Sequence, residues 1–161
     1  MVARGKLLRV YVDTSVVGGS LDEEFRAASI RLIERSRTGD ALLVISDTTL
    51  AELADAPPKV RGVIEDLPKG CLEFVHQDEE SEALAEEYIK DGVVSRQMLV
   101  DAQHIAVATI AKVDVLVSWN FKHIVNLDRI RGFNAVNLRL GYPMLEIRSP
   151  LEVRKDDNED I

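Results

Sequence analysis

Cysteine is almost absent from this chain of 161 residues, which contains only Cys71. An internal disulfide is therefore impossible, and we expect a reducing, cytoplasmic setting. The first residues lack the pattern of a signal peptide. No apolar run approaches the ~18 residues that a membrane span requires, so we expect no membrane partner. Of the whole sequence, 46% of the residues are hydrophobic and only 5% are aromatic. This apolar content is enough to bury the core of one domain.

Basic residues are also in short supply. Lys and Arg number 20 against 28 Asp and Glu, which gives a formal net charge of −8. This balance argues against a broad phosphate-binding surface, because such surfaces are basic. It does not exclude nucleic acid, because a metal-dependent nuclease carries acids in its active site. A modest basic group is present locally at Lys122, His123, Arg129, Arg131 and Arg139.

Apolar runs and helix-like segments alternate along the chain. Strands are predicted at 7–12, 41–45, 72–75, 115–117 and 144–147. Helices are predicted at 23–37, 47–56, 78–90 and 96–112, with a further helical piece after Pro57-Pro58 that ends near Pro68-Lys69-Gly70. We expect a loop at 18–22, and one or two helices at 120–140 interrupted near Gly132. The alternation predicts an α/β fold in which a mainly parallel sheet of about five strands is covered on both faces. One domain is expected at 5–150, followed by an acidic, disordered tail at 151–161.

Three acids stand at the edges of these elements. Asp13 ends the first strand, where open α/β sheets place their ligands, although it is equally suited to cap a following turn. Glu52 lies in Thr-Leu-Ala-Glu-Leu after the second strand, and taken alone it fits a solvated helix face. Asp101 lies near the start of a helix that is apolar almost all round, so its charge needs a partner. Together the three acids predict an oxygen-ligated Mg²⁺ or Mn²⁺ site.

The ordered set of anchors resembles the PIN-domain family of metal-dependent ribonucleases, which includes the VapC-type toxins. The anchors are Val10-Tyr11-Val12-Asp13-Thr14-Ser15, Glu52, Asp101 and Leu116-Val117-Ser118-Trp119-Asn120, and the resemblance covers nearly the whole chain. It implies a PIN-like three-layer α/β/α sandwich. It also implies that Asp13, Glu52 and Asp101 hold Mg²⁺ or Mn²⁺, with Ser15 and Ser118 positioning metal-bound water or phosphate.

The fourth anchor departs from the family pattern. That pattern looks like Thr/Ser-x-Asp-x-Asp-Phe, whereas Ser118-Trp119-Asn120-Phe121-Lys122-His123 lacks both acids. Asn120 still offers a carbonyl oxygen and is included among the catalytic candidates, but it adds no charge. His123 and Asn126 are secondary candidates for substrate binding, and structural roles are expected for His123 and His104.

The resemblance implies an endoribonuclease that hydrolyses phosphodiester bonds of single-stranded or looped RNA, as the toxin of a toxin–antitoxin module. It also implies a small antitoxin partner and a homodimer. The alternative is a PIN-like domain with weak or lost catalysis that binds RNA or protein, which the Asn120 substitution favours. A receiver-like signalling domain fits less well, because the first strand ends in a single aspartate.

Overall fold

A computed structural model describes residues 7–153 of the chain. Residues 154–161, which include most of the acidic tail expected at 151–161, lie outside this range. Within it, no helix is both long and apolar enough to cross a membrane. The elements in chain order are β1 (Leu8–Val12), α1 (Thr14–Gly19), α2 (Arg26–Arg37), β2 (Ala41–Ser46), α3 (Asp47–Ala54), α4 (Pro58–Glu65), η1 (Lys69–Cys71), β3 (Leu72–Val75), α5 (Glu79–Lys90), η2 (Arg96–Met98), α6 (Leu99–Ile110), β4 (Val115–Val117), α7 (Leu127–Arg139), β5 (Ile147–Arg148) and η3 (Pro150–Glu152).

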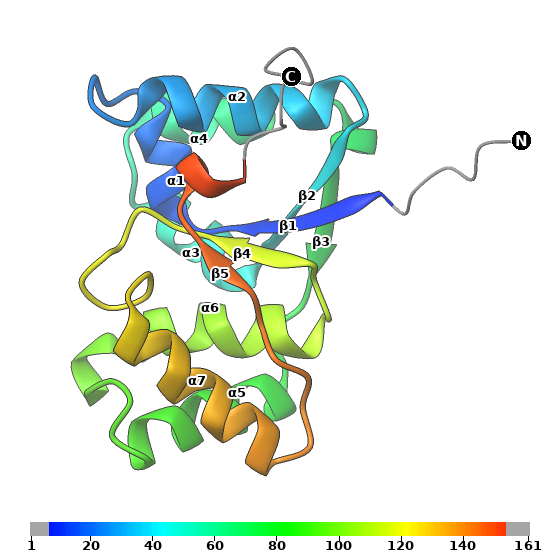
Figure 1. Ribbon diagram of the computed structural model, residues 1–161. Helices are drawn as coiled ribbons and strands as arrows, with labels where there is room; N and C mark the ends of the chain where they lie inside the picture. Colours follow the sequence, from blue (N-terminus) through cyan, green and yellow to red (C-terminus); the bar gives the residue numbers. More distant parts are fainter. Residues whose placement is uncertain (1–6, 154–161) are drawn as a thin grey trace, which may run out of the picture.

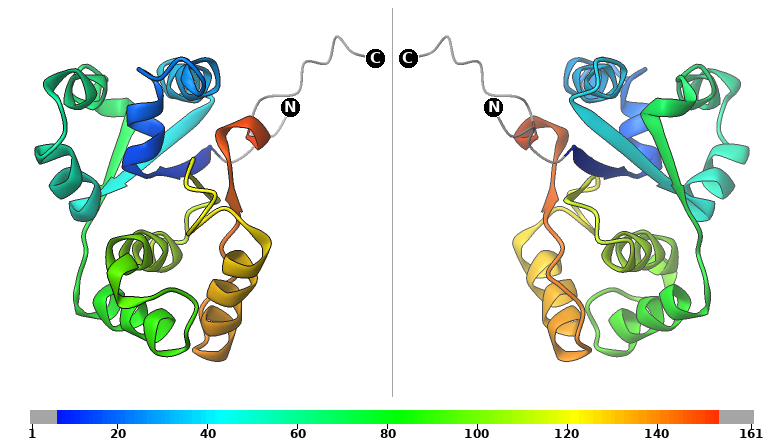
Figure 2. Two further views of the ribbon diagram at one scale, coloured as in Figure 1. Left: turned by 90° about the vertical axis from the view of Figure 1, so that its left-hand side faces the viewer. Right: turned by 90° about the vertical axis from the view of Figure 1, so that its right-hand side faces the viewer.

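All five strands are parallel and form one sheet in the order β3-β2-β1-β4-β5. One helical layer contains α1, α2 and α4, and the other contains α5, α6 and α7 (Figures 1 and 2). The helices α6 and α5 pack closely against each other within the second layer. The predicted three-layer α/β/α architecture is therefore confirmed.

Each face of the sheet has its own hydrophobic core, because side chains alternate along a strand. In β1, Val10 and Val12 pack with α1, α2 and α4, whereas Tyr11 packs on the opposite face with α5, α6 and α7. All three side chains are essentially inaccessible to solvent. This alternation directs the hydroxyl of Tyr11 toward α6, which matters for the site described below.

The structure corrects three predicted boundaries. The segment expected as a loop at 18–22 begins within α1, which Asp13 caps through the amide of Val16. The helix α7 continues through Gly132, where an added Cβ would lie 2.8 Å from Val93, so this glycine permits close packing and does not end the helix. The last strand comprises only Ile147–Arg148, so it is shorter and later than the predicted 144–147.

The start of α5 is stabilised by a reciprocal capping arrangement. The carboxylate of Asp78 accepts the amide of Ser81 at 2.9 Å, and the hydroxyl of Ser81 accepts the amide of Asp78 at 2.9 Å. We expect Asp78→Ala to lower the free energy of unfolding by about 1 kcal/mol, because amides of the first turn lose their acceptor. Urea denaturation measures this change. Glu79→Gln in the same turn is the control, and an equal loss in that variant would point to charge and not to capping.

Candidate carboxylate site

The candidate site lies at the point where the strand order reverses direction. Strands β2 and β3 extend to one side of β1, and β4 and β5 extend to the other, so β1 and β4 are neighbours at the centre. Open parallel sheets bind ligands beyond the carboxyl ends of the strands at such a point. Asp13 directly follows β1 and Ser118 directly follows β4. Figure 1 shows both strand ends and the start of α6 on the same side of the molecule.

Asp13 is fixed by donors from both strand ends. Its Oδ1 accepts the hydroxyl of Ser15 at 2.6 Å and the amide of Val16 at 3.3 Å, and its Oδ2 accepts the hydroxyl of Ser118 at 2.5 Å. Only 5% of the residue is exposed. Burial raises the pKa of Asp13 above its ordinary value, although nearby His104 and the three donors oppose the rise. The carboxylate is therefore buried at an energetic cost and aligned by its neighbours.

Glu52 reaches the site from α3. Its Oε1 accepts the hydroxyl of Thr14 at 2.8 Å and contacts Nε2 of His104 at 2.5 Å. Partial burial opposes ionisation, but His104 and Thr14 outweigh it, and the pKa of Glu52 falls below its ordinary value. Glu52 is therefore an ionised member of the site and not the solvated residue that its local sequence alone suggests.

His104 is a member of the site that the sequence analysis assigned to structure alone. Its Nδ1 contacts the hydroxyl of Tyr11 at 2.6 Å, and that hydroxyl contacts Ser46 Oγ at 2.6 Å. Burial disfavours its charge, but Tyr11, Glu52 and Asp13 outweigh burial and raise the pKa of His104 to about 10. The sequence feature that could have placed His104 in the site is its spacing from Asp101, because residues three apart share a helix face.

Asp101 lies in the first turn of α6 and is half-buried. Desolvation raises its pKa, His104 and His123 oppose the rise, and the charges of Asp13 and Glu52 add to it. The structure thus brings all three predicted carboxylates into one electrostatic neighbourhood. Their mutual repulsion is the property that a divalent cation would relieve.

The loop after β4 holds Asn120 in a local turn. The backbone amide of Asn120 donates to Ser118 Oγ at 2.9 Å, and its side-chain Oδ1 accepts the backbone amide of His123 at 3.0 Å. The side-chain nitrogen of Asn120 makes no hydrogen bond within residues 7–153. Asn126 caps α7 by accepting the amide of Arg129 and also donates to the carbonyls of Phe121 and Lys122. Asn126 is therefore occupied in shaping the loop.

Carboxylate oxygens are suitable ligands for Mg²⁺, but here only one or two of them could bind the ion directly. Among residues 7–153, no three His, Cys, Asp or Glu side chains converge on one position that could hold a metal ion. Mg²⁺ is commonly held by one or two carboxylates together with water and substrate phosphate. Asp13 and Asp101 match that requirement, whereas the contacts of Glu52 with His104 and Thr14 favour a role through water.

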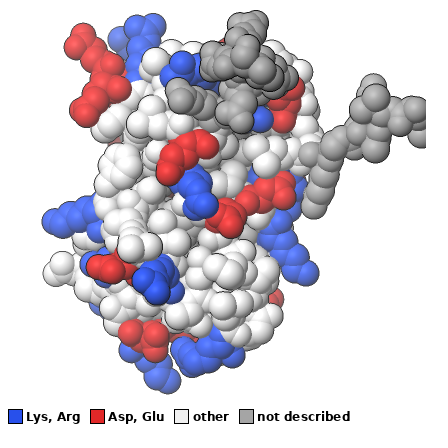
Figure 3. All heavy atoms as spheres, viewed as in Figure 1, with Lys and Arg blue, Asp and Glu red and all other residues white. Residues whose placement is uncertain are grey.

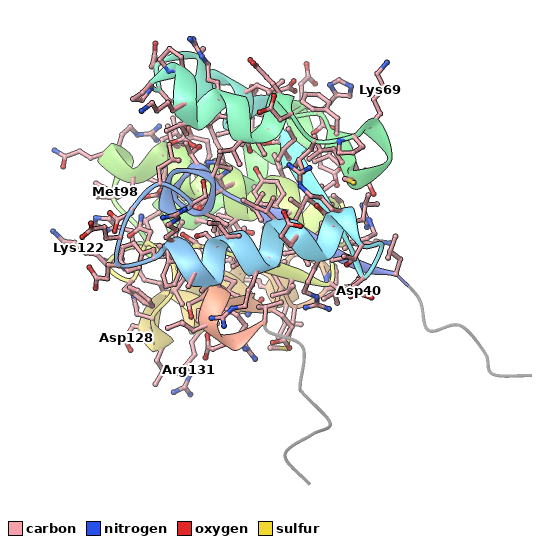
Figure 4. The ribbon with its side chains drawn as sticks, turned by 90° about the horizontal axis from the view of Figure 1, so that it is seen from above. Asp40, Lys69, Met98, Lys122, Asp128 and Arg131 are labelled. Carbon is pink, nitrogen blue, oxygen red and sulfur yellow. The ribbon has the colours of Figure 1, made fainter. Side chains whose placement is uncertain are left out.

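The basic residues noted in the sequence do not form one phosphate-binding patch. Arg129 donates to the carbonyl of Val93, and Arg139 lies 3.6 Å from Glu87 and 3.8 Å from Asp91. In the view of Figure 4, Lys122 lies away from Arg131. On the face shown in Figure 3, Lys and Arg are interspersed with Asp and Glu. This matches the acidic net charge of the chain.

Two solved structures share this arrangement of strands and helices. The VapBC2 structure from Rickettsia felis, bound to a promoter DNA fragment, contains a chain that aligns with a TM-score of 0.56 at 14% identity, over 88% of this chain and 98% of the other. The sarcin-ricin-loop-cleaving toxin VapC20 of Mycobacterium tuberculosis aligns with a TM-score of 0.54 at 15% identity, over 71% and 92% of the two chains. The chain has a VapC-type PIN-domain fold. No family profile and no curated protein matches its sequence. At these identities the likeness concerns the PIN fold alone.

Proposed function

We propose that this protein is an Mg²⁺- or Mn²⁺-dependent endoribonuclease that cleaves single-stranded or looped RNA. The observation that carries the proposal is the meeting of Asp13, Glu52 and Asp101 at the reversal point of a PIN-type sheet, where their charges act on one another. Electrostatic crowding of carboxylates is costly unless a cation or a proton compensates it. The PIN fold of two VapC proteins supports the same proposal.

The proposed chemistry assigns a separate task to each side chain. When bound, the divalent cation lowers the pKa of a water molecule and neutralises charge on the phosphate. Asp13 and Asp101 would hold the cation, and Ser15 and Ser118 align Asp13 through their hydroxyl groups. Glu52, kept ionised by His104, would accept a proton from the attacking water as its oxygen bonds to phosphorus. The P–O bond to one sugar oxygen would break, and that oxygen would take up a proton from solvent. The side-chain nitrogen of Asn120 is a donor for a phosphate oxygen.

Single strands are the favoured substrate because unstacked RNA reaches a recessed site more easily than a duplex does. VapC20 is described as cleaving a looped RNA, the sarcin-ricin loop. VapBC2 was solved bound to a promoter fragment. We infer by analogy that this chain acts as the toxin of a cytoplasmic toxin–antitoxin module, with a small antitoxin and a homodimeric assembly as partners.

A second candidate is a PIN-like binding module with weak or lost catalysis. Two features of Asn120 favour this candidate. Its side-chain oxygen already accepts the amide of His123, and its side chain carries no negative charge to bind a cation. Such a module would bind RNA or protein through the same loops without cutting a phosphodiester bond.

Cleavage of a mixed-sequence single-stranded RNA tests the proposal. We expect products with Mn²⁺ or Mg²⁺ and none with EDTA. We also expect activity to fall strongly in Asp101→Asn and to persist in Glu65→Gln, which removes an exposed acid in α4. RNA binding without products under either metal would instead favour the binding module.

Metal binding should also be visible in stability. Because a cation relieves the repulsion around Asp101, we expect Mg²⁺ at about 100 times its dissociation constant to stabilise the fold by about 2.7 kcal/mol relative to EDTA. Thermal melting measures this gain. The gain should be retained in Glu65→Gln and reduced in Asp101→Asn. An equal gain in Asp101→Asn would place the metal elsewhere.

A further inference from the structure

A small pocket adjoins the carboxylate site and shares two of its residues. The pocket has a volume of about 410 Å³ and is lined by Ser15, Gly18, Gly19, Asp22, Phe25, Trp119 and Asn120. Ser15 Oγ donates to Asp13 and accepts the amide of Trp119 at 2.9 Å. One wall of the pocket is therefore joined by hydrogen bonds to Asp13 and includes Ser15 and Asn120 of the carboxylate site.

An ordered pair of aromatic rings forms another wall. Phe25 and Trp119 are stacked with ring centroids 4.3 Å apart and planes inclined by 22°. The indole nitrogen of Trp119 donates to Ser29 Oγ at 2.8 Å. An added Cβ at Gly19 would lie 2.8 Å from that nitrogen, so the glycine backbone is pressed against the indole. These contacts fix the rings before any ligand arrives.

The polar groups of the pocket suit the edge of a nucleobase. The exposed carboxylate of Asp22 accepts the amide of Glu24 through Oδ1, which leaves acceptor capacity on the side chain. The side-chain nitrogen of Asn120 carries two N–H donors, so the one that does not face the phosphate is available to a base. Flat apolar faces with donors and acceptors along the edge are what distinguish bases from sugars and phosphates.

We propose that this pocket binds the base of a nucleotide next to the scissile phosphate, which makes it a specificity site. The inference rests on the proposed ribonuclease function, because the shared wall of Ser15 and Asn120 connects a base in the pocket to a phosphate at the carboxylates. The base packs against Phe25, which the buried Trp119 supports by stacking, and its edge faces Asp22 and Asn120. The volume lies within the range of sites that take small ligands, roughly 300–1,000 Å³.

Trp119 is the only tryptophan in the sequence, so its fluorescence reports on the pocket directly. The probes are an eight-nucleotide mixed-sequence RNA and an abasic ribose-phosphate oligomer of equal length, each titrated into the full chain in EDTA. We expect the RNA to change the emission and the abasic oligomer to leave it unchanged. This readout needs neither metal nor cleavage.

Two variants test the pocket without touching the carboxylates. Gly18 lines the pocket, and an added Cβ there meets nothing within 4 Å, so Gly18→Leu places apolar bulk at the pocket with no clash at its first side-chain atom. Phe25→Leu removes a ring but keeps apolar volume. We expect each to weaken RNA affinity about tenfold, in keeping with the effect of losing an aromatic base contact. The control is Phe74→Leu, an exposed phenylalanine on edge strand β3.

The outcomes separate the two proposals. An RNA-specific response that Gly18→Leu weakens about tenfold, without metal-dependent products, supports the base pocket and overturns the ribonuclease. Metal-dependent products with unchanged Trp119 emission and unchanged RNA affinity in Gly18→Leu support the ribonuclease and overturn the base pocket. An equal response to the abasic oligomer also overturns it, because phosphate alone would then account for binding.

Discussion

Asp13→Asn is expected to lower the rate of RNA cleavage by at least about a hundredfold, the scale on which preorganised active-site groups act. Asparagine is close in shape but carries no charge. Its single oxygen cannot accept every hydrogen bond that Ser15, Ser118 and the amide of Val16 now donate to the two carboxylate oxygens. The variant thus loses a cation ligand and the alignment of its neighbours. Initial rates at saturating Mn²⁺ measure the loss.

Folding must be matched before these rates are compared. The raised pKa of Asp13 means that its charge is disfavoured in the fold, so loss of the charge in Asp13→Asn offsets part of the stability lost with the hydrogen bonds. Thermal melting in EDTA shows whether the variant is folded at the assay temperature. Glu65→Gln controls for removal of one negative charge. A native rate in a folded Asp13→Asn protein would exclude this carboxylate from the chemistry.

His104→Ala is expected to lower the free energy of unfolding by about 3 kcal/mol, measured by urea denaturation in EDTA. The imidazole is buried between Glu52 and Tyr11, and its removal leaves a cavity and takes a partner from both. Deleting one member of a buried ion pair costs about 3–5 kcal/mol. We expect a loss of stability at the lower end of this range because the Glu52 side chain is 37% exposed and solvent screens its charge. His76→Ala, at an exposed histidine, is the control.

The pH dependence of this difference tests the same interaction. The pKa of His104 rises from 6.5 to about 10 on folding, so its stabilising contribution is fully present below pH 6.5 and is lost as the pH rises toward 10. We expect the gap between the native protein and His104→Ala to be larger at pH 6.5 than at pH 9.5. A gap that is constant over this range would assign His104 to packing alone.

Parts of the site could be predicted because strand ends in a parallel sheet share one edge. Asp13 and Ser118 each follow an apolar run directly, so their meeting needs only the correct strand order. The two interpretations of Asp13 were not exclusive, since it caps α1 and also faces the site. Asp101 was indicated by the conflict between its charge and an apolar helix.

The role of His104 could not be predicted because it depends on packing between distant elements. Tyr11 reaches it only because that face of β1 lies against α6, a contact across 93 residues. The element boundaries failed for local reasons. Gly18 and Gly19 suggested a loop where α1 forms, and Gly132 suggested a break where α7 needs close contact with Val93.

The central position of β4 beside β1 has a consequence for synthesis. During translation, β1, β2 and β3 leave the ribosome first. The other edge of β1 stays unpaired until β4, which begins at Val115, has been made. Asp101, Ser118 and Asn120 are also absent from shorter nascent chains. Domains form their long-range pairings only once the required segments exist. The site therefore assembles only after the chain has been made beyond Asn120, and a product that ends before this residue cannot carry it.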